Sequence, residues 1–165
     1  MSDGPIENYT YSPWSDRPGT KLGFSAVGPG WTSILKVLDA LMVSSVAHAV
    51  QHATVVKEEY RDKECNADAS ISILQIKEKF GGLRVYWQGS GLGDRIWNQV
   101  SGSVNMAEGM AYQTCERCGS MEEVENRPRA GAKYSRTLTL CGSCHEDRDN
   151  EDGKVPFEMG NGDKV

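Results

Sequence analysis

The chain has 165 residues, an apolar content of 38% and a net charge of −5, which suits one modest domain or a small domain with a metal-stabilised appendage. We expect no membrane span, because no uninterrupted apolar run reaches about 18 residues, and no secretory signal, because Met1–Pro5 lacks a basic region before an apolar segment. The expected compartment is a reducing cytoplasm, where cysteines bind metals more often than they form disulfides.

Residues 1–30 are expected to form an extended arm, because proline and glycine recur along them and interrupt every periodicity. The arm nevertheless contains Tyr9, Tyr11 and Trp14. These rings have two interpretations: they pack against the body of the protein, or they form a contact surface for a partner.

The segment Trp31–Arg61 carries the strongest helical pattern in the chain. Its apolar residues recur at steps of three and four, which predicts a helix with one buried stripe: Ile34, Leu38, Leu41, Met42, Ser45, Ala49, Ala53 and Val56. His48 and His52 lie one turn apart, but no glutamate follows the first histidine as in a zinc-protease helix. We therefore do not expect a second metal site there.

A β-hairpin and a second helix follow. Ser70–Ile76 and Leu83–Trp87 are rich in strand-forming residues, and Gly81 and Gly82 lie between them. We expect Gln88–Gly93 to be a loop and Asp94 to cap a helix that reaches Gln113. The inner side of that helix should carry Ile96, Trp97, Val100, Val104, Ala107 and Ala111. Residues 31–113 are thus predicted to form an α+β body.

Two Cys-x-x-Cys pairs dominate the C-terminal part: Cys115 with Cys118, and Cys141 with Cys144. Four thiolates complete a tetrahedron and leave no open position, so the pattern predicts one structural Zn²⁺. His145 could replace Cys144 as the fourth ligand, but four thiolates need no substitute. The fifth cysteine, Cys65, is expected to be a free thiol.

The 22 residues between Cys118 and Cys141 suggest a hairpin. Met121–Val124 is a candidate first strand, and Tyr134–Leu140 alternates as a returning strand. Acidic residues after Cys144 suit the first turn of a helix. We therefore expect residues 114–150 to form a treble-clef-like zinc module, with a zinc ribbon that lacks the helix as the alternative.

The C-terminal segment is acidic. Residues 146–165 contain seven acidic and three basic side chains, which gives −4 of the net charge. We expect a flexible tail over residues 151–165.

The octapeptide Lys77–Arg84, Lys-Glu-Lys-Phe-Gly-Gly-Leu-Arg, followed by a helix and two cysteine pairs, resembles a family of small uncharacterised bacterial and bacteriophage proteins. The resemblance covers roughly residues 30–145 and implies no particular activity. It does imply a context, namely a phage or mobile-element protein acting inside a bacterial cell.

Basic residues of the hairpin and the module are candidate contacts for an anion or a nucleic acid: Lys77, Lys79, Arg84, Arg117, Arg129 and Arg136. The Gly-Gly turn is not a P-loop, because the Gly-Lys-Ser/Thr ending is missing. A cytidine-deaminase site would need a different set of zinc ligands with an open position. We therefore do not expect an enzyme.

Three functions remain in view. The first is a non-catalytic, zinc-stabilised binding protein, a phage factor that inhibits or redirects a bacterial host protein complex such as a defence system. The second is binding of nucleic acid or a nucleotide through the zinc module and the basic hairpin. The third is an enzyme acting on phosphate esters.

Overall fold

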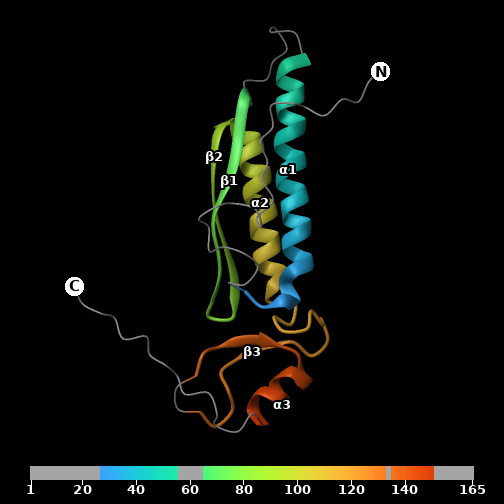
Figure 1. Ribbon diagram of the computed structural model, residues 1–165, viewed down its shortest axis with the longest axis vertical. Helices are drawn as coiled ribbons and strands as arrows, with labels where there is room; N and C mark the ends of the chain where they lie inside the picture. The colour runs from blue at the N-terminus through green and yellow to red at the C-terminus, as the bar shows by residue number, and fades with distance from the viewer. Residues whose placement is uncertain (1–26, 56–64, 133–134, 151–165) are drawn as a thin grey trace, which may run out of the picture.

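The structure, a computed structural model, describes residues 27–55, 65–132 and 135–150. Two helices, α1 (Thr32–Val55) and α2 (Asp94–Ala111), lie side by side and antiparallel, and a long hairpin of β1 (Cys65–Lys79) and β2 (Gly82–Leu92) runs along them (Figure 1). At one end lies a module made of β3 (Glu125–Arg127), β4 (Leu138–Leu140) and α3 (Gly142–Asn150). The predicted α+β class and the order of its parts are confirmed.

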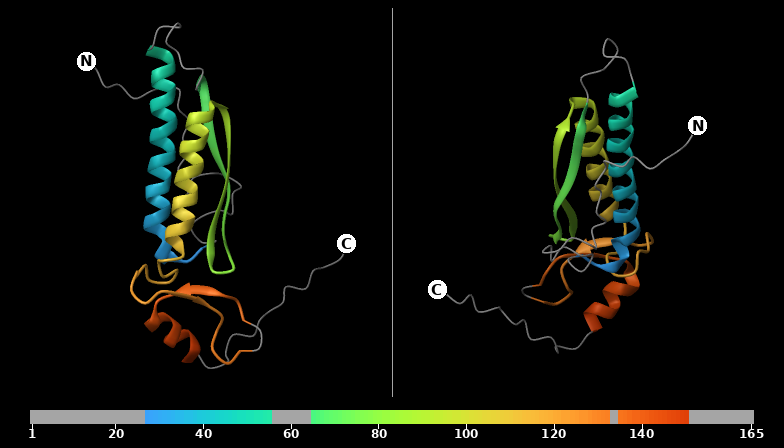
Figure 2. Two further views of the ribbon diagram at one scale, coloured as in Figure 1. Left: turned by 180° about the vertical axis from the view of Figure 1, so that it is seen from behind. Right: turned by 45° about the horizontal axis from the view of Figure 1, so that its top comes forward.

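The main core lies between the helix pair and one face of the hairpin (Figure 2). Helix α1 packs on β1 and α2, and α2 packs on β2. Strand alternation turns Ile76, Leu83 and Val85 towards the helices, where all three are buried. Because α1 contacts both the hairpin and α2, its buried surface is wider than the predicted stripe and also includes Leu35, Val46 and Val50.

The β1–β2 hairpin is longer than predicted. Ser90 pairs with Ser70 and Leu92 with Cys65, so most of the expected loop Gln88–Gly93 is strand. Gly89 looks like a loop residue in the sequence, but a Cβ at this position would lie 2.4 Å from Leu92 Cδ1. The glycine thus allows a side chain to cross the strand closely, and the loop prediction was wrong.

Two details of α2 also differ from expectation. Its N-cap is Gly93, and no side chain caps the helix, so Asp94 is the first helical residue and not the cap. Trp97 was expected on the inner side but is 43% exposed. Its ring packs at an angle of 42° against that of Trp87, with centroids 4.6 Å apart, so it lies at the margin of the core without being buried.

The segment Pro29–Gln51, most of which is α1, is the one helix in the described residues that is long and apolar enough to cross a membrane. A core helix of a globular domain has the same composition, and Leu35, Leu38 and Val46 are buried against the body. The finding therefore does not decide the expectation that no segment spans a membrane.

A fully buried tryptophan joins the body to the module. Trp31, in the 3-10 turn Pro29–Trp31, donates its Nε1–H to the carbonyl oxygen of Thr114 at 2.9 Å. One residue earlier, Gly30 N donates to Glu116 O at 2.8 Å. The end of the expected arm, residues 27–30, is thus packed against the first cysteine pair.

The hairpin ends in a two-residue turn that touches the module. Lys79 pairs with Gly82, and the two residues between them, Phe80 and Gly81, have φ of +54° and +76°. Positive φ at both positions is the mark of a type I′ turn, which suits the twist of a hairpin. Thr139 Oγ1 donates to Gly81 O at 2.6 Å, and Asn126 Nδ2 donates to Phe80 O at 3.2 Å.

The module's own hairpin is shorter than predicted and begins later. Its first strand is Glu125–Arg127, because Asn126 pairs with Thr139 next to the turn of the long hairpin. Met121–Val124 was expected to be that strand, but it is a bend in which Glu123 has a φ of +47°. The contact between the two hairpins decides the register, and this contact is not visible in the local sequence pattern.

Gly30 and Gly102 provide a matched pair of substitutions. A Cβ on Gly30 would lie 2.1 Å from Cys115 O and 2.5 Å from Gly119 N, so Gly30→Ala should destabilise the protein by about 1–3 kcal/mol through overpacking. Gly102, inside α2, has open space around it, and Gly102→Ala should stabilise the protein by about 0.5–1 kcal/mol. Chemical denaturation of both variants measures the difference. Equal midpoints would contradict this packing.

Candidate metal centre and apolar groove

Four cysteine sulfurs gather at the junction of the module. The Sγ atoms of Cys115, Cys118, Cys141 and Cys144 all lie within 4.8 Å of one another, and Cys118 Sγ is 3.6 Å from Cys141 Sγ. A tetrahedral metal with sulfur bonds of about 2.3 Å places its ligands about 3.8 Å apart. The four predicted ligands therefore fit one metal ion.

The first pair forms a tight turn, a knuckle, after α2. Gly119 N donates to Cys115 O at 2.9 Å, and Gly119 takes a φ of +82°. Cys118 N points at Cys115 Sγ at 3.5 Å. Cys115 N donates to Ser120 O at 2.7 Å and closes the loop. This backbone geometry turns both sulfurs to one side, as the Cys-x-x-Cys-Gly pattern predicts.

The second pair opens α3. Cys141 precedes the helix, and Cys144 lies in its first turn. His145 N donates to Cys141 O at 2.9 Å. The positive end of the helix dipole favours a thiolate at this position. The order of knuckle, hairpin and helix is that of the treble-clef-like arrangement, and the presence of α3 excludes the helix-free ribbon.

The thiols of Cys141 and Cys144 have pKa values that shift in opposite directions. The hydroxyl of Ser143 and the N–H of Cys144 lower the pKa of Cys141 to about 6. Burial raises the pKa of Cys144, and the neighbouring sulfurs raise it further. Four thiolates at this separation repel one another, so a cation between them is what allows all four to ionise.

His145 is not part of the cluster. It is buried, and its Nε2 lies 3.0 Å from the carbonyl oxygen of Glu125, so the ring connects α3 to β3. Its Nδ1 has no hydrogen-bond partner in the described part of the chain. The four sulfurs complete the ligand set without it, as expected.

The apolar core of the module is small. Its apolar cluster consists of the buried Leu140 and three of the cysteines, with Val124 and Leu138 packed partly against them. Ionic contacts add to this at the surface, where Arg127 pairs with Asp149 at 2.8 Å. A core this small does not balance the entropy of ordering some 30 residues, so a metal ion held by the four cysteines would supply most of the stability.

The six basic residues suggested as anion contacts lie in different surroundings. Lys77 Nζ lies 4.6 Å from the centroid of Tyr86, and Lys79 Nζ lies 5.5 Å from that of Phe80. Arg84 contacts α2, where it pairs with Glu108 at 3.5 Å and donates to Tyr112 Oη at 3.2 Å. These three lie on the long hairpin.

The other three belong to the module. Arg136 binds Glu78 of the long hairpin through Nε at 2.6 Å. Arg129 donates to the carbonyl oxygen of Asp149 at 3.3 Å, and Arg117 is exposed on the first knuckle. The structure therefore does not gather the six into one cluster. Tyr9, Tyr11 and Trp14, the acidic tail, and the side chains of His52 and Cys65 lie outside the described residues.

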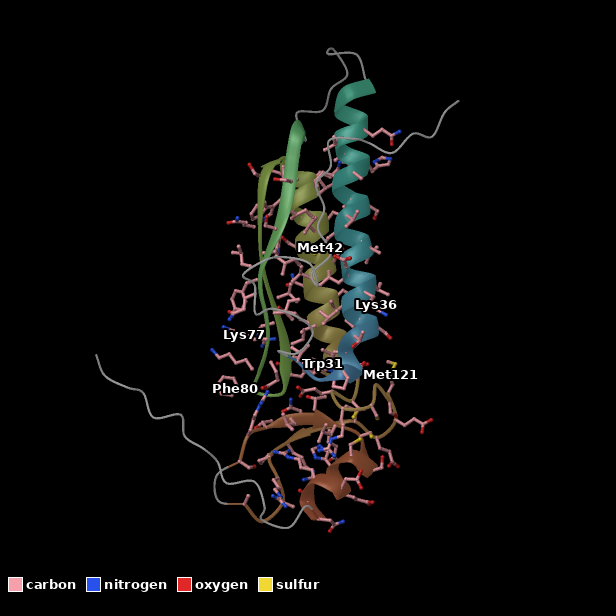
Figure 3. All side chains as sticks on the ribbon, viewed as in Figure 1. Trp31, Lys36, Met42, Lys77, Phe80 and Met121 are labelled. Atoms are coloured by element: carbon pink, nitrogen blue, oxygen red, sulfur yellow. The ribbon has the colours of Figure 1, made fainter. Side chains whose placement is uncertain are left out.

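An apolar groove runs between the outer sides of α1 and α2 and ends at the first knuckle. Its volume is about 390 Å³. Val37, Met106, Met110 and Met121 line it and are 57%, 52%, 43% and 63% exposed. Met121 lies where α1 meets the module (Figure 3). The lining includes no acidic or basic residue.

Sequence reasoning missed this groove. Val37 lies off the buried stripe of α1, and Met106 and Met110 lie off that of α2, each one helical turn or less from a buried neighbour. The large apolar residues outside the buried stripe of each helix were the feature of the sequence that could have indicated the groove. The pattern on each helix could not show that the two outer stripes meet, because that depends on how the helices pair.

A second hollow, of about 370 Å³, lies between the middle of α1 and the start of α2. Ser44, His48, Arg95 and Gln99 contribute to its polar lining. His48 thus lies in a hollow between the two helices, and no cysteine is part of the lining of this hollow.

Comparison with protein-family models, curated proteins and solved structures found no match to this chain. The assignment of the site therefore rests on its own geometry and chemistry.

We expect the purified protein to carry one zinc per chain and to lose it when Cys141 or Cys144 is replaced by serine. Structural zinc contributes about 10–16 kcal/mol in comparable small modules, so the variants should lose ordered structure over residues 115–145. Elemental analysis and hydrogen exchange measure the two effects. Cys65→Ser is the matched control and should keep the metal. A wild-type chain free of metal would refute the assignment.

Proposed function

We propose that this chain is a non-catalytic binding protein, stabilised by a structural zinc ion, that acts by docking another protein into the groove between α1 and α2. The observation that carries the proposal is the exposure of Val37, Met106, Met110 and Met121 along one groove. A folded chain gains nothing from leaving these side chains in water, and contiguous exposed apolar surface marks interaction sites.

The chemistry of the groove favours an amphipathic helix as its occupant. Two antiparallel helices form its walls, and Met106 and Met110 are spaced by one turn. A third helix can insert its apolar ridge between such walls. Methionine side chains are flexible and polarisable, which suits a surface that adapts to its ligand.

The proposed role of zinc is structural. Four thiolates fill a tetrahedral shell, so no position remains for a water molecule that the ion could activate. The ion instead fixes the knuckle, and the knuckle residues Cys118 and Gly119 close one end of the groove. Metal binding and the shape of the docking surface are thereby coupled.

We propose a bacterial host protein or protein complex in the cytoplasm, such as part of a defence system, as the partner that a phage factor of this kind inhibits or redirects. This part of the proposal rests on the resemblance of Lys77–Arg84 and the cysteine pairs to bacterial and bacteriophage proteins. The groove itself supports only the docking of an apolar helix.

A photo-crosslinking residue at Met106, used in a bacterial lysate, tests the docking surface. We expect one stoichiometric adduct, and we expect it to disappear when Met110→Asp is added, because the carboxylate would be desolvated in the groove. Met110 is 43% exposed, so the change should leave the fold and the zinc content intact.

The matched control is Leu74→Asp, which places the same charge on a 49% exposed leucine of the hairpin. The adduct should survive this change. If no adduct forms, or if both aspartate variants behave alike, the groove is not the docking surface.

A further inference from the structure

The turn of the long hairpin carries a residue that folding alone does not favour. Type I′ turns have φ above zero at both central positions, so asparagine or glycine is preferred at the first of them. Here that position is Phe80, with a φ of +54°. A bulky side chain in this conformation stores strain, and strained residues cluster at functional sites.

The ring of Phe80 gains no burial in return. It is 74% exposed, the highest value among the large apolar side chains described as exposed. Figure 3 shows Phe80 and Lys77 on the side of the hairpin that faces away from the helices. The module holds the turn by its backbone, through Asn126 and Thr139, and leaves the ring in solvent.

Lysines accompany the exposed rings. Lys79 Nζ lies 5.5 Å from the Phe80 centroid, and Lys77 Nζ lies 4.6 Å from that of Tyr86, which is 42% exposed. Tyr86 pairs across the hairpin with Gln75, five residues before Phe80. At about 3.3 Å per strand residue the backbone positions of Gln75 and Phe80 are roughly 17 Å apart, with Lys77 and Lys79 between them.

The outer face of the hairpin, between residues 70 and 90, has no carboxylate. Strand alternation places on it Ser70, Ser72, Gln75, Lys77, Lys79, Tyr86, Gln88 and Ser90. The guanidinium of Arg84 instead contacts Glu108 and Tyr112. The acidic residue of this stretch, Glu78, turns away towards the module, where its side chain is 4% exposed and binds Arg136. A basic face without acids, in a chain of net charge −5, is complementary to a polyanion.

We propose that this outer face of the β1–β2 hairpin binds single-stranded nucleic acid. Unpaired bases stack on Phe80 and Tyr86, and Lys77 and Lys79 contact the phosphates of the strand between them. Alternation of aromatic rings and cations is how proteins hold single strands without reading their sequence. A duplex hides the faces of its bases and cannot stack on the rings in this way. The site goes beyond the docking groove and shares none of its lining residues.

Fluorescence anisotropy of the zinc-loaded full chain with labelled oligothymidine and oligouridine at low salt tests the proposal. We expect binding that weakens with salt. Phe80→Asn should lower the affinity about five-fold or more through the loss of one stacked base. Asparagine is favoured in a type I′ turn, so the melting temperature should not fall. Lys36→Gln, at an exposed lysine of α1 outside both the hairpin and the groove, should leave the affinity unchanged.

The salt dependence of binding distinguishes the contribution of the two lysines from that of the aromatic rings. Replacing Lys77 and Lys79 by glutamine should reduce the slope of log affinity against log salt by about 1.4, since each phosphate contact contributes about 0.7 in single strands. Oligothymidine and oligouridine should bind alike, because stacking and phosphate contacts are common to both. The proposal is overturned if neither oligonucleotide binds at low salt, if a duplex of equal length binds as tightly, or if Phe80→Asn binds like the wild type.

Discussion

The peptide that joins α2 to the first cysteine knuckle is where the two parts of the molecule meet, and the rest of the structure depends on its position. Trp31 donates to Thr114 O, Gly30 donates to Glu116 O, and Glu116 N donates to Thr139 O. The start of α1, the end of α2 and strand β4 are therefore all held by hydrogen bonds to the short segment 114–116. Since Cys115 lies in this segment, the four-sulfur cluster controls a junction as well as the module beyond it.

The junction includes a buried acid whose surroundings reflect this crowding. Glu116 Oε1 accepts from Gly28 N at 3.2 Å, and Oε2 is buried without a partner among the described residues. Burial raises the pKa of this carboxyl, and the nearby charge of Glu78 raises it further. Burying a carboxyl costs free energy unless its surroundings compensate for it. We therefore regard the contact between the body and the module at Glu116 as specific.

Local chemistry accounts for what could be predicted from the sequence. The Cys-x-x-Cys pairs, the stripe of α1 and the strand-forming residues of the hairpin each follow from neighbouring residues, so their type and order were predicted. The errors lie where distant segments meet. Gln88–Gly93 was predicted to be a loop because its pairing with β1 was unknown, and β3 was placed too early because its register depends on Thr139 and the hairpin turn.

The clustering of the four cysteines could be predicted from their spacing, whereas the groove and the basic face could not. The groove exists because the outer stripes of two helices far apart in the sequence become neighbours. The basic face exists because successive side chains of a strand point to opposite faces. Lys77 and Lys79 therefore lie on the outer face and Glu78 on the other, although the three are adjacent in the chain. Arg84 and Arg136, which looked equivalent to the lysines, are held by Glu108 and Glu78.

Two surfaces with different chemistry thus share one scaffold. The groove is apolar and uncharged and lies on the helix pair, while the outer face of the hairpin is basic and carries exposed rings. Both border the module, at the knuckle and at the hairpin turn respectively. A metal ion held by the four cysteines would fix the module and thereby position one end of each surface, which is how a structural ion would serve the proposed binding.

The most direct test of this account is X-ray absorption at the zinc edge of the purified full-length protein. The account predicts four sulfur neighbours at about 2.3 Å and no nitrogen or oxygen ligand. A shell that contains nitrogen or oxygen, or fewer than four sulfurs, would contradict the closed thiolate site on which the junction and both surfaces depend.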